Sequence, residues 1–376
     1  MVPRWVRWML LSAFFGLAPS IRSKHPPGVS LGRSFLPRAV AFNTEGRFQR
    51  GAPPSEATPH GASMVPIYRG MSLVSETATG ELEPVLLSSE QVQMGEASWL
   101  GTAEESSALA ELQRKASHRL GSGFWMLDVS NCFDQAPSLS DLGLREDFNA
   151  SPSVSSTSAQ WHKLRSRAGA SVVDRLASED YAALLAVAAG MSAWHRSVRF
   201  CATCGAPTEA VRSGLQRQCC QCGSRFRPRV DPAMLVLVTD GDRCLLGRKA
   251  SWPAGRFSAL AGFVEFGETL EECVIREVRE ESGVLVDPKS ICFVASQPWL
   301  FPRSLLLGFT AKPVSTEIKL TEELEDVKWF EADYIEACLA EADDIDASDT
   351  RFNIPSRTSL ANSLIHGWLQ SIRAQK

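Results

Sequence analysis

The chain has 376 residues, an apolar share of 44% and a formal net charge of −4 at pH 7. That length predicts two or three domains, and the apolar share is enough for packed cores. The small net charge excludes a global attraction to nucleic acid or to anionic membranes. Ten cysteines spread over so long a chain exclude a small disulfide-stapled protein.

The first 60 residues differ in composition from the rest. Arg4 and Arg7 precede an apolar run over residues 8–18, which is too short for a membrane span of about 20 residues but suits the centre of a signal peptide. Basic residues outnumber acidic ones from there to residue 49, as in transit peptides. We expect residues 1–60 to be a targeting presequence and linker, which resembles the two-part presequences of algal plastids. A mitochondrial presequence and a disordered terminus are the alternatives, and no stable membrane span is expected in the mature protein.

Residues 61–198 predict an α+β domain. Short apolar runs at Pro84–Leu87 and Phe124–Val129 predict strands, and Ala103–Ala116 predicts a helix. Ser178 is followed by acidic residues and then by apolar ones, a pattern typical of the N-cap of a second helix. No catalytic set of residues is visible in this part of the chain.

Four cysteines within residues 199–229 have the spacing of a zinc ribbon. Two CxxC pairs supply two thiolates each, and two such knuckles complete a tetrahedral site; the ligands are Cys201, Cys204, Cys219 and Cys222. Four protein ligands indicate a closed, structural Zn²⁺ site. A pair of redox dithiols is the alternative. The arginines around the ribbon either form a basic patch for nucleic acid or decorate a module that packs between domains.

Residues 230–376 predict strands mixed with helices. Ala233–Thr239 reads as a buried strand, Asp240–Asp242 as a hairpin turn and Arg243–Arg248 as the returning strand. Further strands are predicted downstream, and a terminal helix is predicted from about Ser359 to Arg373. This order indicates an α/β/α sandwich around a mixed sheet.

An acidic helix follows a glycine-led turn within Gly262–Val284. Residues three and four apart share a helix face, so Glu277, Glu280 and Glu281 project together. Crowded carboxylates repel one another unless a cation lies between them, and hard divalent cations take oxygen ligands. The alternative is a solvated helix in which Arg276 forms salt bridges with Glu272 and Glu280.

The spacing of this stretch resembles the signature of the Nudix hydrolases and fills every fixed place of it. Its fixed letters are G-x5-E-x7-R-E-U-x-E-E-x-G-U, where U is apolar. The downstream array Ser296–Ser304, read as SQPWLFPRS, and the preceding ribbon resemble the NADH pyrophosphatase branch. Two positions depart from that branch: Leu300 replaces a proline, and Arg227 replaces an aromatic residue that helps to stack the dinucleotide.

The resemblance implies a Nudix α/β/α sandwich preceded by a zinc ribbon and a divergent N-terminal domain, as a homodimer. It implies Mg²⁺ or Mn²⁺ ligands at Glu277, Glu280 and Glu281, positioning roles for Arg276 and Glu268, and a catalytic glutamate at Glu323, for which a plain surface acid is the alternative. It also implies substrate contacts, from the following residues: Phe263, Gln297, Trp299, Ser304 and Ala361.

The expected reaction is hydrolysis of the pyrophosphate bond of NADH to NMNH and AMP, with NAD+ as a poorer substrate. The same bond is cut when an NAD cap is removed from RNA, so NAD-capped RNA is an alternative substrate. Hydrolysis of another nucleoside diphosphate derivative, such as ADP-ribose, is a further alternative. A nucleotide sensor without catalysis is disfavoured because every glutamate of the signature is present.

Overall fold

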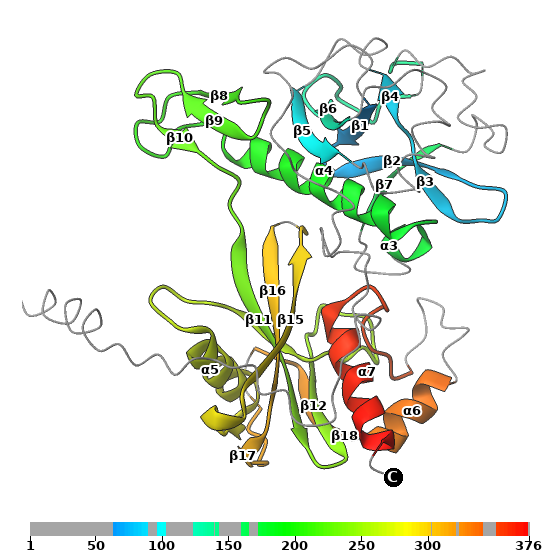
Figure 1. Cartoon of the computed structure of the whole chain (residues 1–376), viewed down its shortest axis with the longest axis vertical. Helices are drawn as coiled ribbons and strands as arrows, with labels where there is room; N and C mark the ends of the chain where they lie inside the picture. Colours follow the sequence, from blue (N-terminus) through cyan, green and yellow to red (C-terminus); the bar gives the residue numbers. More distant parts are fainter. Residues whose placement is uncertain are drawn as a thin grey trace, which may run out of the picture.

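The computed structural model arranges the chain in two lobes joined by a small cysteine-bearing module (Figure 1). The residues that it describes are 63–88, 96–102, 123–138, 140–142, 159–164, 172–301, 303–320, 323–340 and 351–374. The predicted presequence and the predicted helix Ala103–Ala116 lie outside these residues. Within them, no helix combines the length and the apolar character that a bilayer crossing requires.

The N-terminal lobe, residues 63–198, is built on one seven-stranded sheet. Its central strands follow the order β3-β2-β1-β6-β5, while β4 pairs with β1 and β7 pairs with β2. The strands are β1 Ser63–Tyr68, β2 Met71–Glu76, β3 Leu82–Pro84, β4 Leu87–Ser88, β5 Glu96–Thr102, β6 Gly123–Asp128 and β7 Gln160–Lys163. The strand predicted near residue 124 is confirmed as β6.

The strand predicted at Pro84–Leu87 is wrong, because the chain changes partner there. Pro84 ends β3 opposite Val74 of β2, whereas Leu87 begins β4 opposite Met64 of β1. Pro84 has no backbone N–H to donate, although the following Val85 N–H still donates to the Leu73 carbonyl of β2 at 3.1 Å before the chain turns to β1. Residues 85 and 86 are nevertheless buried.

Helix α4, Glu179–Ser197, covers one face of this sheet, and the short helix α3, Val172–Arg175, precedes it (Figure 1). Ser178 is the N-cap of α4, as predicted, since its side chain accepts from the Asp180 backbone N–H at 3.2 Å. Leu184 and Leu185 are fully buried against sheet residues such as Phe124. The helix therefore crosses the lobe and ends shortly before the first cysteine of the module, Cys201.

The cysteine-bearing module contains a three-stranded sheet in the order β10-β9-β8. Its strands are β8 Thr208–Val211, β9 Gln216–Cys219 and β10 Arg225–Phe226. Phe226 packs partly against the core of the N-terminal lobe. The module is thus attached to that lobe before the chain enters β11.

The C-terminal lobe, residues 231–374, contains a mixed six-stranded sheet of order β15-β16-β11-β12-β18, with β13 paired to β11. Its strands are β11 Asp231–Asp240, β12 Arg243–Arg248, β13 Leu260–Phe263, β15 Cys292–Trp299, β16 Ser304–Ala311 and β18 Asp326–Glu331. Strands β11 and β16 are parallel. The predicted hairpin is confirmed: Asp240 pairs with Arg243, and Gly241 adopts a φ of +61°.

Helices cover both faces of this sheet, which confirms the predicted α/β/α sandwich. Alternate side chains of β11 face opposite sides: Leu235 and Leu237 pack with α7, whereas Met234 and Val236 pack with α5. The helices are α5 Leu270–Ser282, α6 Ala332–Ala340 and α7 Leu360–Arg373. The remaining short elements are β14 Leu285–Val286, η3 Pro288–Ser290 and β17 Pro313–Ser315. Because helices cover both faces of the sheet, the apolar run of β11 is buried on both faces.

The two lobes touch at the connection between β15 and β16. Leu300 and Phe301 pack against the core of the N-terminal lobe. A Cβ added to Gly190 of α4 would lie 3.3 Å from the Cβ of Leu300, so the helix and the connection are in close contact. Near the start of α7, the Thr358 hydroxyl donates to the Asp174 carboxylate at 2.7 Å.

Candidate active site

The loop and helix that begin at Gly262 are fixed by local hydrogen bonds at both ends. Thr269 caps α5 by accepting from the Glu272 N–H at 3.2 Å, while the Glu272 carboxylate accepts from the Thr269 N–H at 2.9 Å. Gly283 ends the helix with a φ of +72°, where a Cβ would meet Lys319 at 2.6 Å. The salt bridge considered between Arg276 and Glu272 is wrong, because Glu272 is used for this capping box.

Three carboxylates meet at the inner side of α5, and we call them the carboxylate cluster: Glu277, Glu281 and Glu323. One carboxylate oxygen from each residue lies within 4.8 Å of those of the other two. Glu277 and Glu281 are one helical turn apart and are 6% and 1% exposed. Glu323 reaches them from the segment before β18, and its side chain remains 49% exposed.

The backbone of β13 leaves room for these carboxylates. A Cβ added to Gly262 would lie 1.8 Å from the Glu277 carboxyl carbon, so only glycine fits beneath that group. The adjacent Ala261 N–H donates to Glu281 at 3.2 Å. The first glycine of the motif is therefore required by the close approach of a side chain.

Burial and like charges make the cluster electrostatically unfavourable on its own. Burial raises the pKa of Glu281 to about 8; the Lys249 ammonium opposes the shift, whereas Glu277 and Glu323 add to it. Burial also raises the pKa of Glu277, although Arg276 acts in the opposite direction. A cation among the three oxygens would relieve both effects, so the donor set fits a divalent cation.

Arg276 connects the loop to the helix. Its guanidinium makes two hydrogen bonds to Glu268, at 2.7 and 2.9 Å, and donates to the Phe263 carbonyl at 2.9 Å. The same group reaches Glu277 at 2.8 Å and Glu280 at 2.9 Å. The hydrogen bond from Arg276 is the main reason why the pKa of Glu268 falls to about 2. Arg276 and Glu268 therefore hold one another and orient the buried Glu277.

Glu280 lies differently from its neighbours on the helix. Its side chain is 54% exposed and is paired with Arg276 four residues earlier. The oxygens that approach one another closely belong to Glu277, Glu281 and Glu323 instead. The role of Glu280 as a metal ligand stays a prediction.

A pocket of about 490 Å³ opens beside the cluster, with Glu281 in its wall. Trp299 and Ala361, two of the predicted substrate contacts, also line it. The wall contains apolar side chains from several strands together with two cations, Lys249 and Arg256. A pocket of this size accommodates a nucleoside-sized ligand.

The other three predicted substrate contacts, Phe263, Gln297 and Ser304, are not among the residues that line the pocket. The buried Gln297 amide donates to the Thr358 carbonyl at 2.9 Å and accepts from the Leu360 N–H at 2.8 Å, so it anchors the start of α7. Ser304 is buried at the start of β16. Phe263 is 59% exposed. Their contacts with a substrate stay predictions.

Sequence reasoning missed Lys249, whose ammonium lies 3.7 Å from the Glu323 carboxylate. No spacing rule links residues so far apart in the chain. The link comes from the pairing of β12 with β18, which aligns Arg248 with Asp326 and brings the flanking segments together. Such a pairing can be inferred only once the strand order is known.

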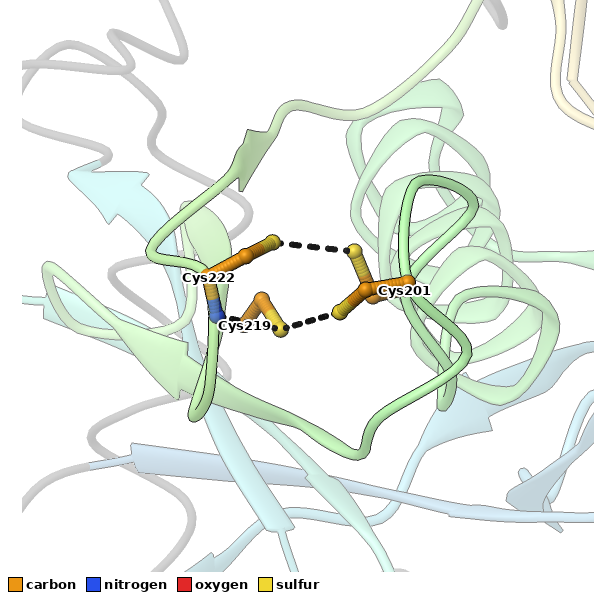
Figure 2. Close-up of side chains that lie close together, drawn as sticks. Cys201, Cys219 and Cys222 are labelled. Atoms are coloured by element: carbon orange, nitrogen blue, oxygen red, sulfur yellow. Dashed lines mark hydrogen bonds between the residues drawn. The ribbon is translucent and has the colours of Figure 1, made fainter.

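The four predicted cysteines converge in the small module, and Figure 2 shows Cys201, Cys219 and Cys222 facing one another. All four sulfur atoms lie within 4.8 Å of one another, and we call them the thiolate cluster. The Cys201 and Cys222 sulfurs are 3.6 Å apart, and those of Cys204 and Cys219 are 3.5 Å apart. The neighbouring Cys220 is exposed and does not belong to this group. The arrangement fits one tetrahedrally coordinated metal ion rather than two separate dithiols.

The arginines near the module are not equivalent. Arg217 is buried, where it donates to the Thr208 hydroxyl at 2.8 Å and to the Thr208 carbonyl at 2.7 Å. Its other nitrogen lies 3.0 Å from His195 at the end of α4. Arg229 pairs with Asp231. Of the two roles predicted for these arginines, Arg217 therefore has the packing role between domains and is not part of a basic surface patch.

Comparisons with known proteins agree with this geometry. The family model described as NUDIX domain matches residues 229–349, and the one described as NADH pyrophosphatase zinc ribbon domain matches residues 196–226. A relative from Mycobacterium bovis (strain BCG / Pasteur 1173P2), named NAD-capped RNA hydrolase NudC, is 41% identical over 197 residues, covering 52% of this chain and 62% of the relative. Human NAD-capped RNA hydrolase NUDT12 is 40% identical over 203 residues, covering 51% and 42%.

The matched part of the chain thus spans less than two thirds of the length of these relatives. A solved NUDIX hydrolase from Nitrosomonas europaea is 22% identical, with a TM-score of 0.33, over 37% of this chain and 80% of that one.

Proposed function

We propose that the chain hydrolyses the pyrophosphate bond of NADH and, less efficiently, of NAD+, because residues 229–349 match the NUDIX domain model and residues 196–226 match the NADH pyrophosphatase zinc ribbon domain model. The observation that supports this proposal most directly is the carboxylate cluster in the wall of a nucleoside-sized pocket. The products would be AMP and NMNH or NMN.

The carboxylate cluster would hold Mg²⁺ or Mn²⁺. Its donor atoms are all oxygens, which suits a hard divalent cation. Two of its members are buried and have raised pKa values, so a bound cation would stabilise their ionised forms. When bound, such an ion polarises the phosphorus and lowers the pKa of the attacking water. The thiolate cluster, in contrast, would hold Zn²⁺ in a closed and structural site.

Each side chain around the cluster has a separate task in this proposal. Arg276 and Glu268 hold Glu277 in place, and the Ala261 N–H orients Glu281. The buried Glu277 and Glu281 would hold the ion, and we assign Glu323, the most exposed member of the cluster, to accepting the proton of the attacking water. Lys249 lies beside Glu323, where its positive charge would favour the approach of the diphosphate.

The test is product analysis with purified protein that has been stripped of metal. NADH, NAD+, ADP-ribose, ADP-glucose and diadenosine polyphosphates are incubated with Mg²⁺ or Mn²⁺. We expect NADH to give the highest kcat/KM, with AMP and NMNH as products and no turnover after chelation. A clear preference for a substrate without nicotinamide would overturn the assignment.

Removal of an NAD cap from RNA is the second candidate, because the relatives described above carry the name NAD-capped RNA hydrolase and the bond cut is identical. Kinetics on NADH and NAD-capped RNA, measured side by side, would decide between the two. A kcat/KM that is higher for the RNA would reverse their order. The homodimer and the organellar location remain predictions that size measurements and localisation of a tagged full-length chain would test.

A further inference from the structure

A second pocket, of about 450 Å³, lies where the cysteine-bearing module meets the N-terminal lobe, and we call it the junction pocket. Ala97 of β5 and Trp125 of β6 form its wall on the side of the lobe. The module contributes residues of the β8–β9 hairpin and Arg225 of β10. None of the described residues that line it belongs to the C-terminal lobe, which carries the carboxylate cluster (Figure 1). The pocket is therefore separate from the candidate active site.

The module is basic although the whole chain is acidic. Residues 199–229 contain six arginines and a single acid, Glu209, whereas the chain has a formal net charge of −4. Arg212 and Arg225 line the junction pocket, and Glu209 does not. Neither of the two guanidinium groups has a hydrogen bond or an ion pair among the described residues. The junction pocket thus carries positive charge that no neighbouring carboxylate balances.

Strand alternation places the polar groups of the pocket on one face of the module's sheet. Gln216 and Gln218 are two residues apart on β9, and Arg225 of β10 pairs with Gln218, so the three side chains share a face. Arg217, between the two glutamines, points to the opposite face, where it donates to Thr208 and approaches the end of α4. The face that carries Arg225 is therefore not the one that attaches the module to α4.

The Gln216 side chain is buried in this pocket without a protein partner. It is 7% exposed and lines the pocket, and its amide has no hydrogen bond among the described residues. A buried amide that makes no hydrogen bond is costly, and buried side-chain amides are normally hydrogen-bonded. Its oxygen accepts and its NH2 group donates, so a polar ligand in the pocket satisfies both. Gln218 offers a second amide on the same face.

The turn that carries Arg212 is fixed in an uncommon conformation. Arg212, Ser213 and Gly214 have φ angles of +50°, +55° and +78°, a left-handed run that is unfavourable for the two residues with side chains. The Leu215 N–H donates to the Arg212 carbonyl at 3.1 Å, and the Leu215 side chain packs against the core that contains Trp125. The turn is thus anchored to the N-terminal lobe and holds Arg212 at the pocket.

We propose that the junction pocket binds a nucleotide, whose phosphate is held by Arg212 and Arg225. Guanidinium groups match phosphate oxygens with paired, charge-assisted hydrogen bonds. The Gln216 and Gln218 amides donate to and accept from the base or the ribose. The volume of the pocket lies within the range of small-molecule sites. This inference goes beyond the proposed function and does not depend on it, because no residue of the junction pocket takes part in the hydrolysis.

The first experiment locates binding by amide hydrogen exchange in the full-length, zinc-loaded protein without Mg²⁺. AMP should protect the β8–β9 hairpin, whereas adenosine, which lacks the phosphate, should not. Protection of α5 and β13 is read separately from the same data, so the two pockets are distinguished. Hairpin protection by AMP and adenosine alike, or by neither, would overturn the inference. Hairpin protection by AMP in a protein that does not hydrolyse NADH would overturn the proposed function alone.

The second experiment tests the two arginines. Arg225→Gln and Arg212→Asn each remove a guanidinium group that has no partner among the described residues, and asparagine tolerates the left-handed backbone of Arg212. We expect the AMP concentration for half-maximal hairpin protection to rise about 10–100-fold in each variant, as for one lost charge-assisted contact. Zinc content and Tm should equal those of the parent. An unchanged AMP affinity in both variants would overturn the inference.

Arg199→Gln is the matched control, because Arg199 is exposed in the same module and does not line the pocket. It should keep the parent affinity for AMP, and a loss as large as that of Arg225→Gln would show a diffuse attraction of charges rather than a site. A single-stranded oligoadenylate then distinguishes the two sources of a nucleotide. Hairpin protection at a lower concentration of the strand than of AMP would assign the site to RNA. Protection by AMP alone would assign it to a free nucleotide, and either result supports the inference.

Discussion

The molecule contains two clusters of side chains that can bind a metal ion, and the two are built in opposite ways. The thiolate cluster takes all four sulfurs from two knuckles within residues 201–222, and backbone N–H groups approach them: Thr203 to Cys201, and Gln221 and Cys222 to Cys219, each at 3.4 Å. The carboxylate cluster combines two buried residues of α5 with Glu323 from a distant segment. One is local and closed, whereas the other is assembled by the sheet and opens on a pocket.

This difference indicates which cluster is suited to catalysis. Four protein ligands complete the coordination of a tetrahedral ion and leave no position for a substrate. The carboxylates of the open cluster supply fewer than six ligands, so they leave positions of a six-coordinate ion for water and phosphate oxygens. The cations Arg276 and Lys249 lie beside the open cluster and prepare it for an anionic substrate. The closed cluster should therefore control stability, and the open one activity.

The largest expected effect is on activity in Glu281→Gln. Glu281 is the most buried carboxylate of the cluster, and the amide removes a charged ligand without changing the shape of the side chain. Changes to groups that only support a metal ligand cost about 10–100-fold, so loss of the ligand itself should lower kcat at least about 100-fold. The measurement is steady-state hydrolysis of NADH at saturating Mg²⁺.

Glu271→Gln is the matched control for that variant, because Glu271 is exposed in the first turn of the same helix. It should keep the parent kcat and thermal stability. If Glu281→Gln retained the parent kcat while Glu271→Gln lost it, the carboxylate cluster could not be the reactive site.

The second effect is on stability and distinguishes neighbouring cysteines. Cys219→Ser removes a buried member of the thiolate cluster, so we expect loss of bound zinc and a fall of several degrees in Tm, since a structural metal contributes directly to folding. Cys220→Ser changes the adjacent, exposed thiol and should leave both quantities unchanged. Metal content by mass spectrometry and thermal unfolding are the measurements. Equal zinc loss in both variants would show that Cys220 is a ligand.

The same contrast explains what the sequence allowed us to predict. The thiolate cluster was predicted completely, because its four ligands lie in two short turns whose local spacing determines their geometry. Helical spacing likewise brings Glu277 and Glu281 together. The fold class was predicted for a related reason, since the apolar run of β11 and the amphipathic character of α5 are local patterns.

Contacts that depend on tertiary pairing were not predictable in this way. Lys249 approaches Glu323 only because β12 pairs with β18. Helical spacing groups Glu280 with Glu277 and Glu281 and equally allows its salt bridge with Arg276, which the structure contains, but spacing alone cannot decide between these two arrangements. The partner change that divides β3 from β4 similarly depends on the position of β1.

A third prediction concerns pH, and it applies to the carboxylate cluster alone. A metal binds the ionised carboxylate, and the pKa of Glu281 in the metal-free protein is about 8. Below pH 8 a proton must leave, so the apparent affinity for Mg²⁺ should fall about tenfold for each pH unit and should level off above pH 8. Titration of metal-free protein by calorimetry between pH 6 and pH 9 measures it.

The stability of the metal-free protein should change in the opposite direction. The folded-state pKa of Glu281 lies above its ordinary value of 4.5, so the neutral form favours folding at low pH, and this contribution is lost as the pH rises from about 4.5 to about 8. Tm of the metal-free parent should therefore fall across this range, and Glu281→Gln should reduce the fall. A Tm that rises over the same range would contradict the assigned burial.

The smallest effect is expected for Glu280→Gln, the variant that decides which carboxylates complete the open cluster. The Glu280 side chain is 54% exposed, and its salt bridge with Arg276 is of a kind that contributes about 0–1 kcal/mol. Glutamine retains an oxygen that accepts from Arg276, so Glu277 should keep its orientation and kcat should fall less than about tenfold. NADH hydrolysis and Mg²⁺ affinity are measured together. A loss as large as that of Glu281→Gln, with weaker Mg²⁺ binding, would show that Glu280 leaves Arg276 for the metal, as the helical spacing alone predicts.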